Sequence, residues 1–184
     1  MNKKLLVIVA VAVAALTACQ YNDANKTQRH TKPDFSTIAV GNFDVNRYMG
    51  TWYEIARLDF FWEKNLQNVS ATYTLKNDGS VEVDNKGFDY MKQKNKQSIG
   101  KAKFVAEPTK AALKVSFFGP FYSGYNVAKI DPEYKYALVF GENRDYMWIL
   151  SREKTIPDAI KQDFLNLAKT NGYDTEKLVW TEQE

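Results

Sequence analysis

Residue types that carry out catalysis or bind metals are scarce in this sequence. Its 184 residues include one histidine, His30, and one cysteine, Cys19, and no Gly-x-Ser-x-Gly or phosphate-binding glycine motif. Glu54 is the one acid on the inward side of an alternating stretch. A buried carboxylate there could serve as an acid or base, but a structural hydrogen-bond acceptor near Trp52 is the simpler interpretation. We therefore predict no enzymatic activity, no metal site and no cofactor.

The residues before Cys19 indicate that the chain is exported and that this cysteine is modified. Lys3 and Lys4 are followed by an apolar run over residues 5–16. This run suits a secretory signal of roughly 7 to 15 apolar residues and is short of the ~20 that a membrane span needs. Leu16-Thr17-Ala18-Cys19 resembles the lipobox of bacterial lipoproteins, in which the chain is cut before the cysteine and the thiol is acylated. The alternative is an ordinary signal peptide with an incidental cysteine.

Cleavage before Cys19 would divide the chain into three segments. Residues 1–18 are the predicted lipoprotein signal peptide, residues 19–41 a flexible tether from the lipidated cysteine, and residues 42–184 one folded domain. His30 falls in the polar tether, which argues against a metal or catalytic role. Lys3 and Lys4 leave with the signal, so the mature chain is nearly neutral and no nucleic-acid partner is indicated.

The folded domain reads as a series of short strands. Turn sequences such as Asn77-Asp78-Gly79 and Asp131-Pro132-Glu133 separate runs of alternating polarity. The short connections predict antiparallel neighbours. The expected strands cover residues 51–58, 68–76, 79–86, 98–106, 111–118, 124–131, 134–141 and 145–151.

A helix is expected after the eighth strand. Residues 155–172 carry apolar side chains at helical spacing, with Thr155 as a candidate cap and Asn171-Gly172 at the end. A last strand over residues 177–181 follows. The predicted fold class is all-β: an eight-stranded antiparallel up-and-down barrel with one C-terminal α-helix packed outside and a final short strand.

Connections in such a meander alternate between two ends, and the longer ones gather at one of them. They are expected over residues 59–67, 87–97, 119–123 and 141–145. The first contains three consecutive aromatic residues, which cannot share one strand face, and we expect them to form a lid at the rim of an open cup: Phe60, Phe61 and Trp62. Local loop packing is the alternative. The same rim carries Tyr90, Met91, Phe121 and Tyr122, and a lysine-rich loop that either binds a phosphate or is solvated surface: Lys64, Lys92, Lys94 and Lys96.

Alternation along the strands assigns the inner face of the barrel. The expected ligand-contacting residues there are Ala71, Tyr73, Val83, Asn85, Ser98, Ala102, Leu113, Val115, Phe117, Asn126, Val139, Tyr146 and Trp148. Val81, Gly100, Ala128 and Ala137 are assigned to the same face. The small residues among them leave room for an acyl chain, and no lysine or arginine is included, so a charged head group is expected at the rim. A filled core is the alternative.

Three blocks of sequence resemble one known family. NRYMGTWYEIARLD, ALKVSFFGPFYSGYNV and RDYMWILSR are similar to the bacterial outer-membrane lipoprotein lipocalins, and the similarity runs from about Asn42 to Thr181. The resemblance implies the lipocalin calyx, with Arg152 lying over Trp52 at the closed end in a structural role. It also implies binding of a fatty acid or lysophospholipid and, with Gln20 after the cysteine, attachment to the outer membrane on its periplasmic face.

Three functions follow as hypotheses. The first is a lipid-anchored protein that holds a single-chain lipid for storage or transport in the cell envelope. The second is an envelope scaffold with a filled barrel, and the least favoured is a lipid-processing enzyme. The sequence leaves the oligomeric state open, a homodimer included.

Overall fold

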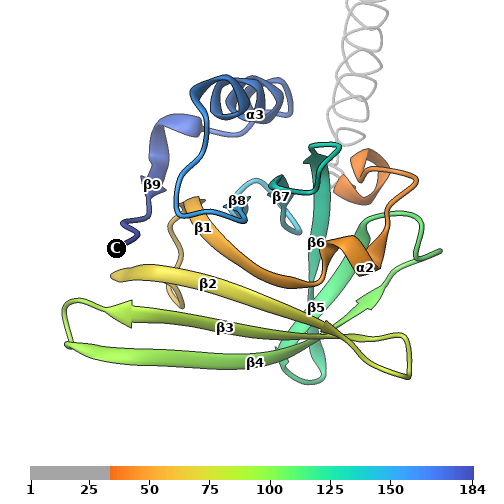
Figure 1. Ribbon diagram of the computed structural model, residues 1–184, viewed down its shortest axis with the longest axis horizontal. Coiled ribbons are helices and arrows are strands. Elements are labelled where there is room, and N and C mark those ends of the chain that lie inside the picture. Colours follow the sequence, from red (N-terminus) through yellow and green to blue (C-terminus); the bar gives the residue numbers. More distant parts are fainter. Residues whose placement is uncertain (1–33) are drawn as a thin grey trace, which may run out of the picture. The chain divides into compact units, whose positions relative to one another are not determined.

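Eight antiparallel strands close into a barrel in the computed structural model, which describes residues 34–184 (Figure 1). The strands are β1 (Gly50–Leu58), β2 (Leu66–Leu75), β3 (Val81–Asp89), β4 (Lys94–Phe104), β5 (Ala112–Phe118), β6 (Phe121–Ile130), β7 (Tyr136–Phe140) and β8 (Met147–Ser151). A short strand, β9 (Leu178–Trp180), pairs with β1 outside the barrel. The helices are η1 (Phe35–Ile38), α2 (Val45–Tyr48), α3 (Asp158–Thr170) and η2 (Thr175–Lys177). The fold class predicted from the sequence is confirmed.

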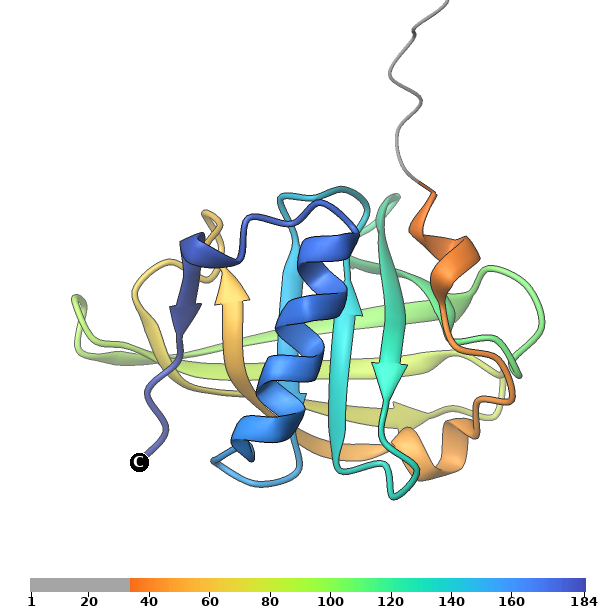
Figure 2. The same ribbon diagram turned by 90° about the horizontal axis from the view of Figure 1, so that it is seen from above.

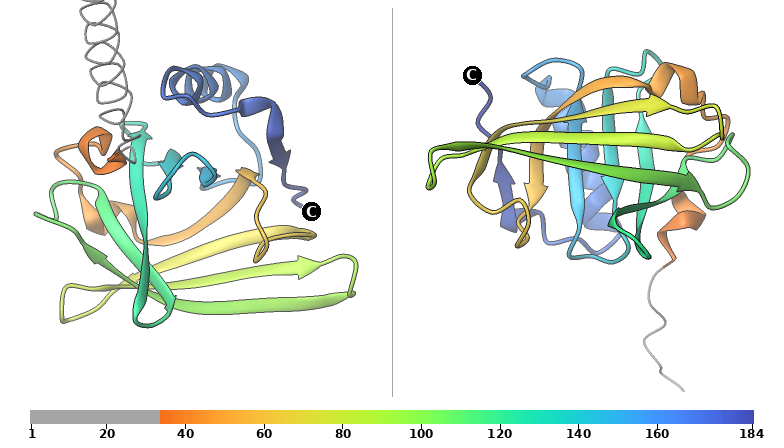
Figure 3. Two further views of the ribbon diagram at one scale, coloured as in Figure 1. Left: turned by 180° about the vertical axis from the view of Figure 1, so that it is seen from behind. Right: turned by 90° about the horizontal axis from the view of Figure 1, so that it is seen from below.

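Each strand pairs with its neighbours in the sequence, and β1 closes the ring. β1 pairs with β8 on one side and with β2 on the other, where Trp52 lies opposite Ala71. The long strands β2, β3 and β4 form the side of the barrel that lies opposite α3 (Figure 1; Figure 3, left). Among residues 34–184, no helix is long and apolar enough to cross a bilayer.

The helix α3 packs on the outside of the barrel over β7 and β8 (Figure 2). Phe164 and Ala168 on its apolar face are fully buried in a cluster with strand residues such as Phe140 and Ile149. The predicted helix and its apolar face are confirmed. The predicted cap is wrong: Pro157 occupies the N-cap position, and the Thr155 carbonyl instead accepts a hydrogen bond from the Ser151 hydroxyl at 2.8 Å.

The folded domain begins earlier than predicted. Phe35 and Ala39 are buried, although the sequence placed them in the tether. The Val40 amide donates to the Val127 carbonyl at 2.9 Å, and the Ala111 amide donates to the Val40 carbonyl at 3.0 Å. Buried apolar side chains and backbone hydrogen bonds thus fix a short segment in which the sequence showed no apolar period. The signal peptide, Cys19 and His30 lie outside the described residues.

The connections at one end of the barrel are shorter than predicted. β3 continues to Asp89 and β4 begins at Lys94, so Tyr90–Gln93 are all that remain of the loop expected over residues 87–97. Likewise, β6 begins at Phe121, which leaves Gly119 and Pro120 as the connection from β5. Lys94 and Lys96 are therefore strand residues, and their positions are fixed by the β3–β4 ladder.

Candidate functional site

A cavity of about 1060 Å³ occupies the interior of the barrel. Its size is slightly above the roughly 300–1,000 Å³ range of small-molecule sites. Exposed residues from the 59–65, 90–93 and 118–122 segments border it, so it opens at this end. One reason for the free space is Gly100, where an added Cβ would lie 2.8 Å from the Phe117 ring. The ring therefore lies against the strand backbone.

Most of the residues predicted to contact a ligand border this cavity. From the inner walls these are Ala71, Tyr73, Val83, Asn85, Ser98, Ala102, Leu113, Val115 and Phe117, and from the region of the opening Phe60, Phe61, Trp62, Tyr146 and Trp148. Val81 also borders it. Their contact with a ligand stays a prediction. Strict alternation assigned the residues on β2 to β5 correctly, because each of these strands has one face toward the cavity and the other toward solvent.

The prediction is wrong for β6 by one residue. Tyr125 lines the cavity, whereas Asn126 faces away and donates from its amide to the Phe140 and Gly141 carbonyls, both at 3.3 Å. Ala128 belongs to the cluster beneath α3. Both faces of β6 are buried here and a bulge lies between Val127 and Lys129, so the apolar pattern could not show which face is inside.

Two further residues on β7 are inside the barrel but do not border the cavity. Val139 and Ala137 have no exposed surface and belong to the hydrophobic cluster that also contains Trp52 and Leu150. They were predicted to line the cavity, and Val139 to contact the ligand, because alternation gives the face of a strand residue and not whether neighbouring side chains cover it.

Three tyrosine hydroxyl groups form the floor of the cavity. The Tyr125 hydroxyl lies 2.7 Å from that of Tyr48 and 2.8 Å from that of Tyr73. Burial raises the pKa of all three phenols, so they stay neutral and satisfy one another. Tyr48 comes from α2, which the sequence did not predict as an element. The floor is therefore a closed polar network.

Arg152 lies directly beneath this floor. Its guanidinium carbon is 3.9 Å from the centre of the Trp52 ring, which confirms the predicted contact. The same group donates at 2.8 to 3.0 Å to the carbonyls at the end of α2 and the start of β1: Arg47, Tyr48, Met49 and Thr51. The Trp52 indole donates to the Tyr48 carbonyl at 2.8 Å. Arg152 thus ties α2 across the closed end, and neither Arg152 nor Trp52 borders the cavity.

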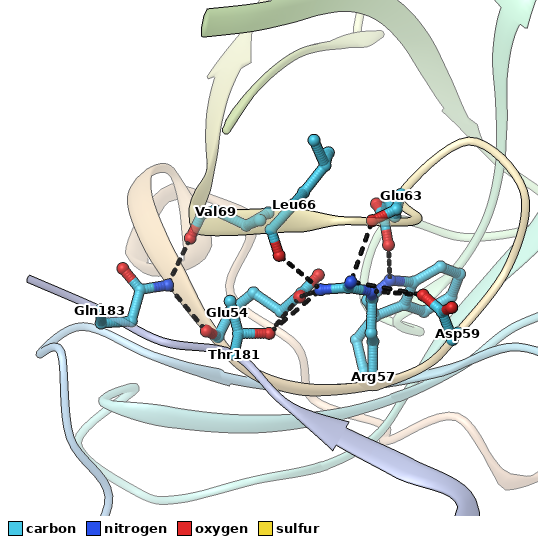
Figure 4. Close-up of polar contacts among 9 residues, drawn as sticks. Glu54, Arg57, Asp59, Glu63, Leu66, Val69, Thr181 and Gln183 are labelled. Carbon is cyan, nitrogen blue, oxygen red and sulfur yellow. Dashed lines mark hydrogen bonds and ion pairs between the residues drawn. The ribbon is translucent and has the colours of Figure 1, made fainter. Parts of the chain in front are cut away.

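A buried ionic cluster closes the barrel wall between β1 and β2 (Figure 4). These strands pair only up to Tyr53 and Ser70, and then separate. The Arg57 guanidinium fills the gap, with 2.7 Å to the Glu54 carboxylate, 2.9 Å to the Glu63 carbonyl and 3.4 Å to the Leu66 carbonyl. Side chains of the C-terminal segment complete it, since Thr181 donates to Glu54, and Gln183 bridges the Glu54 and Val69 carbonyls.

Sequence reasoning placed Glu54 inward as a hydrogen-bond acceptor, which is confirmed, but missed its partner. Strict alternation would turn Arg57 outward. A β-bulge between Glu54 and Ala56 changes the phase of the strand, so that Arg57 and Glu54 share one side. The sequence did contain a signal for this ion pair, because an otherwise apolar segment carries an arginine and an acid three residues apart.

Glu63 borders the cavity together with Glu54 and Asp89, although the sequence pattern turned only Glu54 inward among the acids. Its carboxylate accepts a hydrogen bond from the Trp148 indole at 3.0 Å. Burial, together with the negative charge of Glu54, raises the pKa of the Glu63 carboxyl to about 8. The carboxyl is half-buried because one side borders the cavity. It lies in a loop, where periodicity gives no orientation.

The three aromatic residues of the 59–65 loop do not act alike. The Phe60 ring turns inward and makes edge contacts with Tyr146 and Trp148, with centroids 5.4 and 5.9 Å apart. Phe61 and Trp62 are 79% and 64% exposed. The Trp62 ring packs beside Phe118 at 5.4 Å. Only Phe60 therefore covers the cavity from within.

One amide group of the cavity wall lacks a hydrogen-bond partner among the described residues. The side-chain oxygen of Asn85 is buried and has no hydrogen-bond partner within residues 34–184. Four exposed lysines and one half-buried lysine border the cavity: Lys64, Lys86, Lys92, Lys94 and Lys96. Lys96 is paired with Asp89 at 3.1 Å.

In the part of the chain that the structure describes, no three His, Cys, Asp or Glu side chains gather as metal ligands.

Comparison with known sequences gives a consistent result. A family model described as a lipocalin-like domain matches residues 43–183. The chain is 49% identical over 182 residues to the outer membrane lipoprotein Blc of Escherichia coli K12, with 98% of both chains covered. It is 44% identical to the Blc protein of Vibrio cholerae over 81% of this chain and 88% of the relative. It is 36% identical to temperature-induced lipocalin-1 of Arabidopsis thaliana, over 78% and 81%.

Comparison with solved structures shows the same fold. Insecticyanin from the tobacco hornworm Manduca sexta superposes with a TM-score of 0.64 at 19% identity, over 79% of this chain and 84% of that one. The cockroach allergen Per a 4 gives a TM-score of 0.62 at 21% identity, over 79% and 92%.

Proposed function

The chain belongs to the lipocalin family, and on that premise we propose that it binds a lipid with a single acyl chain in its barrel. The ligand class is a fatty acid or a lysophospholipid, held for storage or transport in the cell envelope. We infer a binding role and not catalysis, since the family and the largely apolar walls of the cavity both favour one.

The observation that carries this proposal is the open cavity of about 1060 Å³ with aliphatic and aromatic walls. Each methylene group that leaves water for such walls contributes about 0.8 kcal/mol, so one long chain gives useful affinity with few polar contacts. The cavity contradicts the filled barrel on which the scaffold hypothesis rested. Two-chain lipids are expected to bind less well, because a small eight-stranded barrel holds one slender ligand.

The head group of the lipid belongs at the opening. The floor tyrosines satisfy one another, and the buried Arg57 guanidinium is already paired with Glu54 at 2.7 Å, so neither compensates the charge of a buried anion. Cationic side chains near the opening, Lys92 and Lys94, suit a carboxylate or phosphate. The Asn85 oxygen is free to accept one hydrogen bond from a hydroxyl group along the chain.

We also propose attachment to the outer membrane through a lipid on Cys19, facing the periplasm. The two Blc proteins named above are outer membrane lipoproteins, and the lipobox supplies the acylation site. Labelling with a palmitate analogue tests this directly. A Cys19→Ala protein that still carried label and stayed in the membrane fraction would rule it out.

Delipidation tests the ligand proposal. The protein is purified without detergent, extracted with organic solvent or a hydrophobic resin, and analysed by mass spectrometry. We expect release of a single-chain lipid and rebinding of added lysophospholipid in a 1:1 complex. A protein that releases no lipid and binds neither a fatty acid nor a lysophospholipid would exclude the carrier function.

A further inference from the structure

Four aromatic side chains form a continuous exposed patch at the open end, which we call the aromatic rim: Phe61, Trp62, Phe118 and Phe121. Ring centroids of Trp62 lie 5.1 Å from Phe61 and 5.4 Å from Phe118, and Phe118 pairs with Phe121 across the β5–β6 connection. All four are more than 60% exposed, and Phe61 and Phe121 reach 79%. Four large aromatic residues of this exposure are unusual on a soluble surface and indicate an interaction site.

Ligand binding does not account for these side chains. Phe60, from the same loop as Phe61 and Trp62, already turns inward onto Tyr146 and Trp148. The four rim residues border the cavity opening, but a ring that covers a ligand would be buried against the cavity wall, whereas Phe61 and Phe121 present most of their surface to solvent. The rim therefore faces something outside the protein.

Positive charge surrounds the aromatic rim. Lys64 follows Trp62 in the loop and is exposed, and Lys92 and Lys94 are exposed at the β3–β4 hairpin, which also borders the cavity opening. The Lys114 amine lies 5.5 Å from the Tyr122 ring, next to Phe121. Exposed aromatic rings bordered by lysines match the interface of a bilayer with anionic head groups, where rings enter the interfacial region and each lysine adds a favourable charge contact.

The start of the described chain lies at this same end. Phe35 packs on Phe140, the last residue of β7, at 5.5 Å between centroids, and the Arg144 guanidinium lies 5.9 Å from the Phe35 ring. The β7–β8 connection that contains Arg144 reaches the opening, since Tyr146 contacts Phe60. Figure 2 shows η1 on the side of the barrel where this connection lies. At about 3.3–3.6 Å per residue, the chain between Cys19 and Asp34 can reach roughly 50 Å.

We propose that the aromatic rim and its lysines dock the open end of the barrel on an anionic lipid bilayer, so that the cavity opens toward the membrane. The anchor and the opening then lie on the same side, and a lipid passes between bilayer and cavity without crossing water. This membrane contact goes beyond ligand binding and has its own test.

Vesicle sedimentation with the fragment of residues 34–184 removes the anchor and isolates the rim. The fragment contains every strand and both hydrophobic clusters, and its circular dichroism spectrum is checked first. We expect it to sediment with phosphatidylglycerol vesicles and about tenfold more weakly with phosphatidylcholine vesicles. Phe118→Ser with Phe121→Ser should lower the partition coefficient at least tenfold on both. Lys64→Gln with Lys94→Gln should lower it only on phosphatidylglycerol.

The matched control is Ile99→Ser with Val105→Ser, which removes two apolar side chains of 60% and 56% exposure outside the rim. It should partition like the parent. Equal partition of the Phe118/Phe121 variant and the parent, or no sedimentation of the parent, would overturn the proposal. So would a parent dimer that this variant converts to a monomer, because the rim would then be an interface between two copies. Native mass spectrometry with lysophospholipid, run in parallel, reports separately on the cavity.

Discussion

The two ends of the barrel use the same residue types to different effect. At the closed end, Trp52, Tyr48 and Tyr73 are buried, and the Arg152 guanidinium contacts the Trp52 ring and donates to the backbone carbonyls around α2. At the open end, Trp62 and three phenylalanines are exposed and lysines stand nearby. An aromatic residue beside a cation thus stabilises the fold where the cation donates its hydrogen bonds within the protein. Where the aromatic ring and the cation are both exposed to solvent, they are available to bind a partner. Substitutions at the closed end should change stability, and those at the open end should change binding.

Arg57 is the strongest challenge to this division, since it is fully buried although it lies in the open half of the barrel. Arg57→Ala leaves the Glu54 carboxylate buried without its 2.7 Å partner and should lower the free energy of unfolding by about 3–5 kcal/mol. Urea titration measures this loss in the free energy of unfolding. Lys76→Ala, which breaks the exposed pair with Glu82, is the matched control and should change stability by less than about 1 kcal/mol. Similar losses in the two variants would show that the wall cluster is not structural.

Arg152→Ala tests the closed end. It removes the ring contact and the donors to the carbonyls around α2, and should lower the free energy of unfolding by about 2–3 kcal/mol. Its affinity for lysophospholipid should equal that of the parent, because Arg152 does not border the cavity. A parent-like urea midpoint, or weaker ligand binding at equal stability, would contradict a purely structural role.

Phe60 and Phe61 are adjacent and test the open end as a pair. Phe60→Ala removes the ring that packs on Trp148 inside the opening, and should weaken lysophospholipid binding by about 1–3 kcal/mol. Phe61→Ala removes a ring that is 79% exposed, and should weaken it by less than about 1 kcal/mol. Titration followed by tryptophan fluorescence measures both affinities. If the two variants bind alike, the inward turn of Phe60 has no part in holding the ligand.

The effect of Glu63 should appear as a pH dependence of stability. Its pKa of about 8 in the folded chain lies above the ordinary value of 4.5, so the folded chain binds more protons than the unfolded chain between these values. The free energy of unfolding should therefore fall as the pH rises through this window and level off above it. Urea titrations at pH 5, 7 and 9 measure this slope, which should be shallower in Glu63→Gln. An unchanged slope would show that Glu63 titrates normally.

The parts of the fold that sequence predicted share one physical property. On β2 to β5 one face of each strand meets the cavity and the other meets solvent. The alternating pattern therefore gave the correct side-chain direction at positions such as Ala71 and Leu113. The signature residues Trp52 and Arg152 were found through resemblance to a family. Asn126 was misplaced because both faces of β6 are buried. Arg57 and Glu63 were missed because a bulge and a loop break the period.

Native mass spectrometry of a cavity-filling variant tests most directly whether the largely apolar cavity binds one acyl chain. Ala71→Trp places an indole in the cavity from β2, and Thr74→Trp places one on the exposed face of the same strand. With added lysophospholipid, the parent and Thr74→Trp should each show a 1:1 complex, and Ala71→Trp should show almost none while still folded by circular dichroism. An Ala71→Trp protein that bound the lipid as well as Thr74→Trp would contradict the claim.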